Sequence, residues 1–266
     1  MDTAQRAVGV QLTNVSKSFG PAGDRTLVLD DINLSITMGE FVTVIGPSGS
    51  GKSTLLKTVA GLLPIDSGTV MVEGMTVDAA TKNKMVGLVP QSPALLPWRT
   101  VLDNVRLPLT VNPRGNTNRV LLDPQQILES FGLGSELSKY PGQLSGGMQQ
   151  RVAIARAFVF NPSVLLMDEP FSALDEMNRE QQRVGLLDFW QSNRKAVLFV
   201  THSVPEAIML SDRIVVMGGA PGHIAEIVSV DLPRPRGIDV YESAAFRELE
   251  DRLRHTLRNV RGAARG

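Results

Sequence analysis

The amino-acid sequence predicts an α/β fold in which buried parallel strands carry a phosphate-binding loop at one edge. The apolar run at residues 41–45 leads directly into a glycine-rich loop and then into the apolar start of a helix. A second short apolar run, at residues 164–168, ends in an acidic residue. Runs of this length are typical of strands that are buried on both faces. Open α/β sheets bind their ligands at the edge where such strands end.

Residues 8–45 are expected to form strands joined by turns, because residues 10–15 alternate between apolar and polar side chains and residues 20–24 contain Gly and Pro. A loop and helix should follow at residues 46–63, stopped by Pro64. Residues 68–74 read as a further strand and turn. Core strands are expected again at residues 164–168, 196–200 and 213–217, and a short one at residues 223–229.

Residues 46–54 have the spacing G-x-x-x-x-G-K-[ST], and the strand before and helix after argue against a chance glycine-rich turn. Gly46, Gly49 and Gly51 permit backbone conformations that a Cβ atom would forbid. The loop N–H groups can then surround a polyphosphate at the helix N-terminus. We expect Lys52 to reach the β- and γ-phosphates and Ser53 to ligate Mg²⁺. The other nucleotide-binding candidates in this loop are Ser48, Ser50 and Thr54.

Asp168 and Glu169 stand at the end of the second apolar run and are followed by Pro170. Beside a phosphate loop, Asp168 is expected to support Mg²⁺ through its water ligands. Glu169 is expected to act as the base or polarising group for an attacking water. The alternative is an acidic cap between strand and loop, which would be the better interpretation if the glycine-rich loop were absent.

Residues 144–151 open a helix in which Ser145 is a good N-cap. Gly146 and Gly147 leave the N-terminus of this helix open to an anion. A second phosphate-binding helix end is redundant inside one site, but it makes sense if it faces a nucleotide held by another subunit.

Taken in order, these motifs resemble the ATP-binding subunits of ABC transporters over about residues 8–230. The loop at residues 46–54 is similar to the family's Walker A, residues 144–149 to its signature and residues 164–169 to its Walker B. The resemblance also identifies a Q-loop at Gln91, a D-loop ending at Asp175 and a switch histidine, His202. Phe19 stands where the family places the aromatic that stacks on adenine, a position often occupied by Tyr.

The resemblance implies roles for these residues. Gln91 would contact Mg²⁺ and signal to a membrane partner, and His202 would contact the γ-phosphate and hold Glu169 and the water. The residues implied to contact the ATP of a partner subunit are Ser145, Gly146, Gly147, Gln149 and Asp175. Structural alternatives remain: Gln91 as an ordinary loop residue, His202 as a structural histidine and Phe19 as a core aromatic.

The fold that the resemblance implies is a RecA-like P-loop NTPase core with an N-terminal antiparallel β subdomain and an inserted helical subdomain at about residues 92–160. The nucleotide-binding domain would span residues 1–230, and a tail with an amphipathic helix residues 231–266. Phe246, Leu249, Leu253 and Leu257 recur at helical spacing in this tail. A helix docked on the core is the favoured interpretation, and binding to a membrane surface is the alternative.

Composition limits the function. Among 266 residues, 27 Lys and Arg balance 27 Asp and Glu, so bulk charge gives no case for nucleic acid. The chain has no Cys, which excludes disulfides and cysteine-based metal sites. The polar N-terminus lacks the apolar segment of a secretory signal, and no run of 18 apolar residues occurs. We therefore expect a peripheral protein on the cytoplasmic face of the membrane.

The predicted function is hydrolysis of ATP, with Mg²⁺, in an ABC importer. The expected partners are a second copy of this chain or a similar ATPase subunit, transmembrane permease subunits and, indirectly, an extracytoplasmic solute-binding protein. Residues 93–105, 167–175 and 233–236 resemble the nitrate, sulfonate and taurine importer group. An ABC exporter or lipid-trafficking ATPase and a soluble ABC ATPase remain as alternatives.

Trp98 and Arg99 follow Pro97 at the start of the expected helical zone. Exposed Trp and Arg are typical anchors of an interface, so we expect this segment to line a groove for a cytoplasmic helix of the permease. The alternative is that Trp98 fills the core of the helical subdomain.

Overall fold

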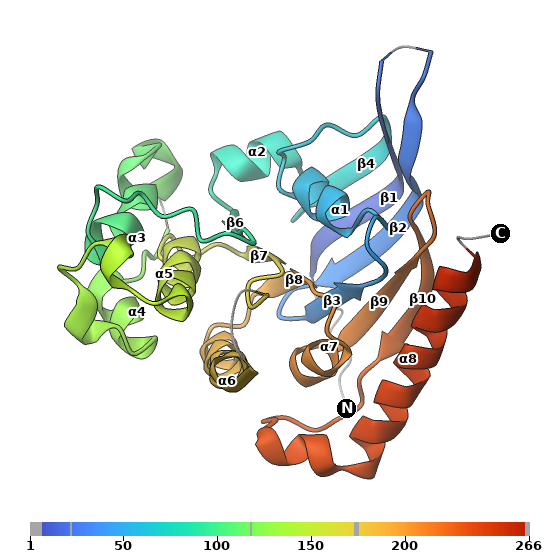
Figure 1. The fold of residues 1–266 in the computed structure, drawn as a ribbon. Helices are drawn as coiled ribbons and strands as arrows, with labels where there is room; N and C mark the ends of the chain where they lie inside the picture. The colour runs from blue at the N-terminus through green and yellow to red at the C-terminus, as the bar shows by residue number, and fades with distance from the viewer. Residues whose placement is uncertain (1–6, 22, 118, 173–175, 264–266) are drawn as a thin grey trace.

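The computed structural model describes residues 7–21, 23–117, 119–172 and 176–263. They form two sheets, seen at the centre of Figure 1. A four-stranded antiparallel sheet has the order β2-β1-β4-β5, and a six-stranded sheet has the order β10-β9-β3-β8-β7-β6. The strands are β1 (Val8–Phe19), β2 (Thr26–Thr37), β3 (Phe41–Ile45), β4 (Ser67–Val72), β5 (Met75–Thr76), β6 (Val86–Val89), β7 (Val164–Asp168), β8 (Ala196–Val200), β9 (Arg213–Gly218) and β10 (His223–Ser229).

The six-stranded sheet is parallel from β6 to β9, and β10 pairs antiparallel with β9. All residues of β3, β7 and β8 are buried, as the continuous apolar runs predicted. Successive side chains of a strand point to opposite faces of the sheet and pack in two different hydrophobic cores. Phe41 and Phe199 join the core under the helical region, whereas Val42 and Leu198 join the core shared with α1 and the antiparallel sheet. The predicted α/β fold class is confirmed.

The helices are α1 (Lys52–Val59), α2 (Val77–Lys82), α3 (Val101–Thr110), α4 (Pro124–Ser130), α5 (Gly146–Phe158), α6 (Glu176–Ser192), α7 (Val204–Leu210) and α8 (Ala244–Ala263). Short 3-10 turns lie at Pro113–Asn116, Gly134–Glu136, Pro141–Gln143 and Ile238–Glu242. Helix α1 ends before the predicted residue 63, because Gly61 adopts a φ of 72° and the Leu62 N–H bonds back to the Lys57 carbonyl at 2.9 Å. None of the described helices is both long and apolar enough to cross a bilayer.

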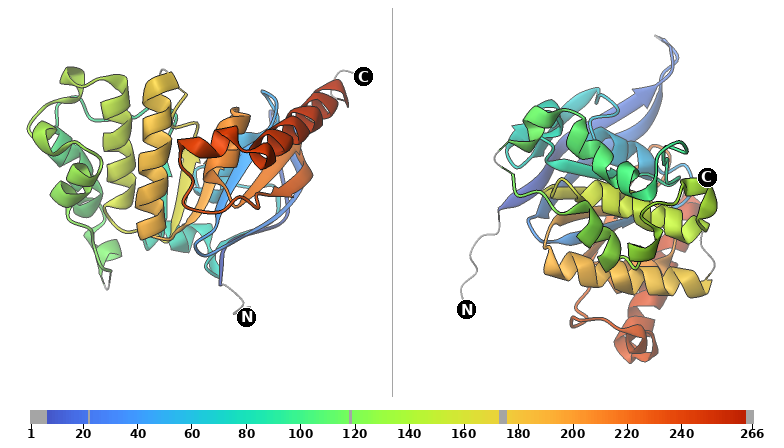
Figure 2. Two further views of the ribbon diagram at one scale, coloured as in Figure 1. Left: turned by 90° about the horizontal axis from the view of Figure 1, so that it is seen from below. Right: turned by 90° about the vertical axis from the view of Figure 1, so that its left-hand side faces the viewer.

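Helices α3, α4 and α5 gather beyond the β6 edge of the sheet, and α8 lies at the opposite end of the molecule (Figure 2). The described part of residues 92–160 contains these helices and their connecting turns, where the helical subdomain was predicted. The limits of that subdomain, and the division between residues 230 and 231, stay predictions.

The C-terminal helix α8 packs on the core through its apolar side. Phe246 and Leu253 are buried against a cluster that includes Ile208 of α7 and Ile214 of β9. Leu249 and Leu257, on the same side, are partly buried against this cluster. The docked interpretation is therefore confirmed, and the side chains that would have faced a membrane are covered by the protein.

The two arginines of the Pro-Arg-Pro-Arg segment before α8 attach this segment to the core. The guanidinium of Arg236, which is 4% exposed, donates to backbone carbonyls at distances of 2.6–3.3 Å. Its partners are Ile208, Met209, Ser211, Val230 and Leu232. Burial lowers the pKa of Arg236 to about 10.

Arg234 makes a second set of contacts in this segment. Its guanidinium lies 4.6 Å from the centre of the Trp190 ring and pairs with Asp212 at 2.9 Å. These contacts satisfy the carbonyls at the C-terminus of α7 and hold the tail against α6.

Candidate nucleotide-binding and catalytic site

Four parallel strands end at the same edge of the sheet and bring the predicted site together. The glycine-rich loop follows β3, Gln91 follows β6, and Asp168 and Glu169 end β7. His202 follows β8, which pairs with both β3 and β7. Residues far apart in the sequence therefore meet at the edge where α/β sheets bind ligands.

The glycine-rich loop owes its shape to three glycines that act in two ways. Gly49 and Gly51 have φ of 82° and 84°, which side-chain-bearing residues rarely adopt. Gly46 was expected to do the same, but its φ is not positive. A Cβ there would lie 2.6 Å from the Met217 carbonyl oxygen, so close packing on β9 explains its glycine. Gly222 supports the loop from outside, since its own Cβ would lie 2.1 Å from the Ser50 carbonyl oxygen.

Within the loop, Ser48 is exposed, Ser50 is buried and Thr54 is half-buried on α1. Lys52 is buried, and its Nζ donates to the carbonyls of Gly46 and Pro47, each at 2.9 Å. These bonds hold the Lys52 ammonium group against the loop. Its positive charge therefore lies where the loop N–H groups would bind an anion.

Ser53 and Asp168 meet directly, with the Ser53 Oγ donating to Oδ1 of Asp168 at 3.0 Å. Burial raises the pKa of Asp168, while the bond from Ser53 opposes this and the charge of Glu169 reinforces it. A divalent cation at this point would relieve the unfavourable burial of the carboxylate. A hydroxyl and a carboxylate are the hard oxygen donors that Mg²⁺ prefers, and Mg²⁺ sites use few protein ligands. The donor set therefore fits Mg²⁺, although the described residues contain no group of three or more acidic, His or Cys side chains that would hold a metal.

The side chains of Gln91 and His202 converge on one oxygen of Glu169. The Gln91 Nε2 donates to Oε2 at 3.4 Å, and the His202 Nδ1 lies 3.2 Å from the same atom. The side chain of Glu169 is 20% exposed and that of His202 is 64% exposed. A carboxylate that contacts an amide N–H and an imidazole nitrogen, and is still open to water, can orient a water molecule and take up its proton.

The backbone of Glu169 is strained. Its φ of 45° is unusual for a residue with a side chain. The conformation is held from both sides. The Glu169 N–H bonds to the Val200 carbonyl at 2.9 Å, and its carbonyl accepts both the N–H of Ser172, at 3.1 Å, and the Ser172 Oγ, at 3.0 Å. These bonds turn the chain sharply after β7 and aim the carboxylate toward Gln91 and His202.

Phe19 ends β1 with 41% of its surface exposed, so it is not a core aromatic. The Nζ of Lys17 lies 5.3 Å from the centre of its ring. Asp66 anchors the strand here by accepting the Ser18 N–H at 2.6 Å and pairing with Arg25 at 2.9 Å. Chiefly because of the Ser18 bond, the pKa of Asp66 is lowered to about 2. Phe19 thus presents an open ring on a fixed strand end, as a stacking platform requires.

The signature residues lie at the N-terminus of α5, which Figure 1 shows in the helical group, to the side of the sheet. The Ser145 Oγ caps this helix by accepting the Met148 N–H at 3.3 Å. Ser145 and Gly146 are exposed and Gly147 is half-buried, so the helix end is open to a ligand from outside the chain. Gln149 is turned inward, its Nε2 donating to the carbonyls of Pro141 and Leu144 at 3.1 and 3.3 Å. Asp175 lies outside the described residues.

Sequence reasoning missed Arg156, which joins the signature helix to the segment after Gln91. Its guanidinium donates to the carbonyls of Pro93 and Ala94 at 2.7 and 2.8 Å. Burial lowers the pKa of Arg156. Ala94, with a φ of 47°, marks a sharp turn in this segment. No motif spacing identifies a contact of this kind, because its acceptors are backbone carbonyls that any residue supplies.

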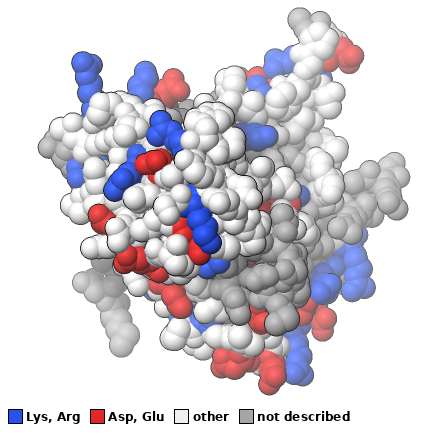
Figure 3. Space-filling view, turned by 60° about the vertical axis from the view of Figure 1, so that its left-hand side comes forward, with Lys and Arg blue, Asp and Glu red and all other residues white. Residues whose placement is uncertain are grey.

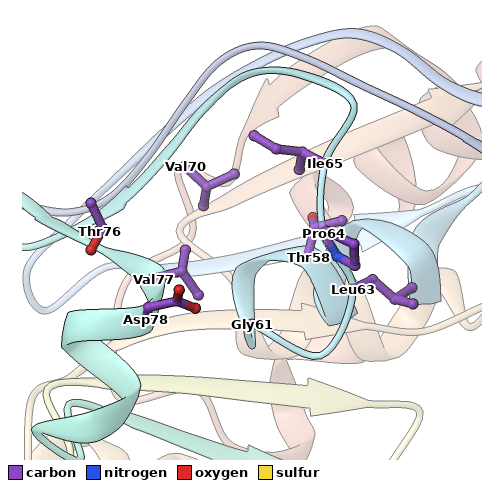
Figure 4. Close-up of a pocket in the computed structure, with 9 residues that line it drawn as sticks. All are labelled: Thr58, Gly61, Leu63, Pro64, Ile65, Val70, Thr76, Val77 and Asp78. Carbon is purple, nitrogen blue, oxygen red and sulfur yellow. The ribbon is translucent and has the colours of Figure 1, made fainter.

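A separate cavity of about 370 Å³ lies beyond the C-terminus of α1, at the opposite end of that helix from the glycine-rich loop. Figure 4 shows the 9 residues that line it, Thr58, Gly61, Leu63, Pro64, Ile65, Val70, Thr76, Val77 and Asp78. Of these described residues only Asp78 is charged, so the cavity lacks the basic groups of a nucleotide site.

The distribution of charged side chains on the surface gives little support to a nucleic-acid partner. On the face drawn in Figure 3, Lys and Arg side chains lie among Asp and Glu and many uncharged residues. This mixture agrees with the net charge of zero. A continuous basic surface, which nucleic-acid binding favours, is not seen among the residues described on this face.

The chain is similar to ATP-binding proteins of ABC transporters. A family model described as ABC transporter matches residues 29–172. An uncharacterized ABC transporter ATP-binding protein of Methanocaldococcus jannaschii is 44% identical over 241 residues, which cover 91% of this chain and 89% of the relative. An aliphatic sulfonates import ATP-binding protein of Bacillus cereus is 39% identical over 244 residues, 92% of this chain and 94% of that one. A solved dimeric ATP-binding cassette, in a post-hydrolysis state with ADP and Pi, matches with a TM-score of 0.73 and 33% identity, covering 84% of this chain and 100% of that chain.

Proposed function

This chain belongs to the ATP-binding subunits of ABC transporters, and we propose that it powers the import of a small sulfonate-class solute through transmembrane permease subunits. As a member of this family it binds and hydrolyses ATP, and the hydrolysis is coupled to transport. The direction and solute class rest on relatives named as aliphatic sulfonate import proteins, which are 39–40% identical over 92% of this chain.

The meeting of Gln91 and His202 on Glu169 is the observation that supports a hydrolytic role for this site. Glu169 would orient the attacking water and receive its proton, and His202 would hold Glu169 in place. Lys52 and the loop N–H groups would bind the β- and γ-phosphates, with Phe19 against the adenine. Ser53 and Gln91 would hold Mg²⁺ directly and Asp168 would hold it through water; the bound ion would neutralise phosphate charge.

The subunit is proposed to act as a dimer in which each ATP lies between two chains. Dimeric cassettes are among the similar solved structures. The open, Ser-capped end of α5 offers N–H groups that its own phosphate loop does not need. In a head-to-tail pair, Ser145, Gly146 and Gly147 of one chain would face the γ-phosphate held by the other. Gln149 and Asp175 are proposed to assist there, on the family pattern alone.

The solute class is tested by transport. With the permease and its solute-binding protein in vesicles, we expect ATP-dependent uptake of an alkanesulfonate. Nitrate serves as a smaller anionic competitor, and the complex without ATP as the blank. Uptake of nitrate in preference to the sulfonate would reject the solute class. Movement of the solute only away from the side that holds its binding protein would reject import.

Trp98 has the features of a docking residue for the permease. It is 71% exposed, so the alternative that it fills a core is wrong. Its loop is nevertheless rigid. The buried Asn104 side chain accepts the Leu96 N–H at 2.8 Å and donates to the Leu96, Arg99 and Thr100 carbonyls at 2.9–3.1 Å. A large aromatic presented on a fixed loop loses little entropy when it binds a partner.

We therefore predict that Trp98→Ala leaves the isolated subunit folded, with its ATPase intact, but weakens its assembly with the permease about tenfold or more. Co-purification of the complex and pull-down titration measure the loss. Val120→Ala is the matched control, because Val120 is 77% exposed in the same helical group. Normal assembly of Trp98→Ala, or equal weakening by both variants, would rule out Trp98 as the anchor.

A further inference from the structure

A buried chain of polar side chains runs from the His202 loop to the C-terminal segment. The Thr201 hydroxyl donates to Oε2 of Glu206, and Oε1 of Glu206 accepts from Nε of Arg183 at 3.3 Å. The Arg183 Nη1 donates to the Tyr241 hydroxyl at 3.2 Å. Thr201, Glu206 and Arg183 are each at most 4% exposed. The chain links the end of β8, the first turn of α7, the middle of α6 and the turn before α8.

The first link fixes the backbone on both sides of His202. The Thr201 Oγ1, besides donating to Glu206, accepts the N–H of Ser203 at 3.1 Å. The Ser203 Oγ accepts the N–H of Glu206 at 3.4 Å, which closes the turn onto α7. The residues before and after His202 are therefore tied to each other and to one carboxylate, so the imidazole leaves this turn in a set direction.

Thr201, Ser203 and Glu206 also line a small cavity together with Glu169 and His202. The cavity has a volume of about 10 Å³ and is bounded by Glu169, Phe171, Ser172, Thr201, His202, Ser203 and Glu206. A space of this size holds about one water, and its hydroxyl and carboxylate walls supply the partners that a buried water needs. Glu206 thus lines the same cavity as Glu169 and His202, and it also holds the turn that carries His202.

A carboxylate this deeply buried is unfavourable unless it is paired. Arg183 supplies the pairing charge. Burial by itself would lower the pKa of Arg183, but Glu206 and Tyr241 outweigh it and hold the pKa above the usual value. Arg183 therefore keeps its positive charge beside the Glu206 carboxyl group. Burying the Arg183 and Glu206 side chains costs desolvation free energy. Apolar side chains could fill the same space without that cost.

We propose that Glu206 is a positioning residue for ATP hydrolysis: held by Arg183, which Tyr241 holds in turn, it fixes the Thr201–Ser203 turn and one water so that His202 stays against Glu169. The C-terminal segment thereby supports the catalytic edge of the sheet through Tyr241. This inference rests on the proposed roles of Glu169 and His202.

Thr201→Val tests the proposal because it keeps the side-chain shape and removes the hydroxyl. With the full chain, we expect kcat for ATP hydrolysis to fall about tenfold while KM and the Kd for ATP change less than about twofold. Thr201→Ser, which keeps the hydroxyl, should restore kcat to within about twofold. A wild-type kcat in Thr201→Val, or equal losses in the Val and Ser variants, would overturn the proposal.

Tyr241→Phe tests the far end of the chain with little risk to folding, and melting temperatures verify that each variant is folded during assay. We expect its kcat to fall about two- to threefold, and the double variant with Thr201→Val to be no slower than Thr201→Val alone. Losses that multiply would show that Tyr241 acts independently of the turn, and would overturn this link. Glu169→Gln is assayed in parallel; if it turned over normally, the proposed catalytic role itself would fail, whatever the Thr201 variants do.

Discussion

Glu169→Gln is expected to lower the rate of ATP hydrolysis by about a hundredfold or more while leaving ATP binding nearly unchanged. The amide has the shape of the carboxylate, so the contacts with Gln91 and His202 can persist. It lacks the negative charge that orients a water molecule and accepts its proton. Because hydrolysis is the step that would separate the two subunits, the ATP-bound dimer should accumulate.

The measurement is a steady-state ATPase assay combined with size-exclusion chromatography in the presence of ATP and Mg²⁺. Glu248→Gln is a suitable control, since Glu248 is an exposed acid on α8, far along the chain from the site. The control should hydrolyse ATP at the wild-type rate and show no dimer in excess of wild type. Turnover by Glu169→Gln at more than about a tenth of the wild-type rate would exclude Glu169 as the catalytic base.

The parts of the site that sequence predicted are those governed by backbone chemistry at a strand end. The glycines of the loop, Ser53 and Asp168 follow from what a polyphosphate and its cation require. The resemblance to the ABC family implied that His202 would hold Glu169, and the contact of His202 with Glu169 agrees. The spacing of Phe246, Leu249, Leu253 and Leu257 likewise predicted which side of α8 docks.

The contacts that support the site and the tail could not be predicted from sequence patterns. Arg156 and Arg236 donate to backbone carbonyls, which have no sequence signature. The partners in the Glu206 chain are separated by 23 and 58 residues, and their meeting depends on how α6 and the tail pack on α7. Gly46 shows a subtler limit: the residue type was expected, but the reason is close packing against Met217 rather than backbone freedom.

The orientation of Gln149 shows a limit of the family pattern. Its amide nitrogen is occupied by the carbonyls of its own chain, so any contact with a partner's ATP would have to use its oxygen or follow a rearrangement. Ser145 is less constrained, because it is exposed at the helix end and its Oγ accepts the Met148 N–H in the capping bond described above. Ser145 is therefore the better residue with which to test whether the site is shared between subunits.

Ser145→Arg is expected to abolish hydrolysis, and a Lys52→Ala chain is expected to rescue it in part. Arg at position 145 places bulk and charge at the open end of α5. Lys52→Ala removes the phosphate-binding cation and should weaken ATP binding on the order of tenfold to a hundredfold. Each variant alone should be inactive, because in a symmetric dimer both composite sites carry the defect.

When the two inactive variants are mixed, both defects of a mixed dimer fall on one composite site and the other site is intact. Random exchange makes half of the dimers mixed, so about a quarter of the wild-type number of sites should be complete. Steady-state ATPase activity of the mixture, compared with each variant alone, measures this. Ser138→Arg is the control for bulk and charge at a nearby exposed serine, and it should remain active by itself. If every site were complete within one chain, mixing would restore nothing, because each chain would keep its own defect. Activity in the mixture therefore requires Ser145 and Lys52 to come from different subunits.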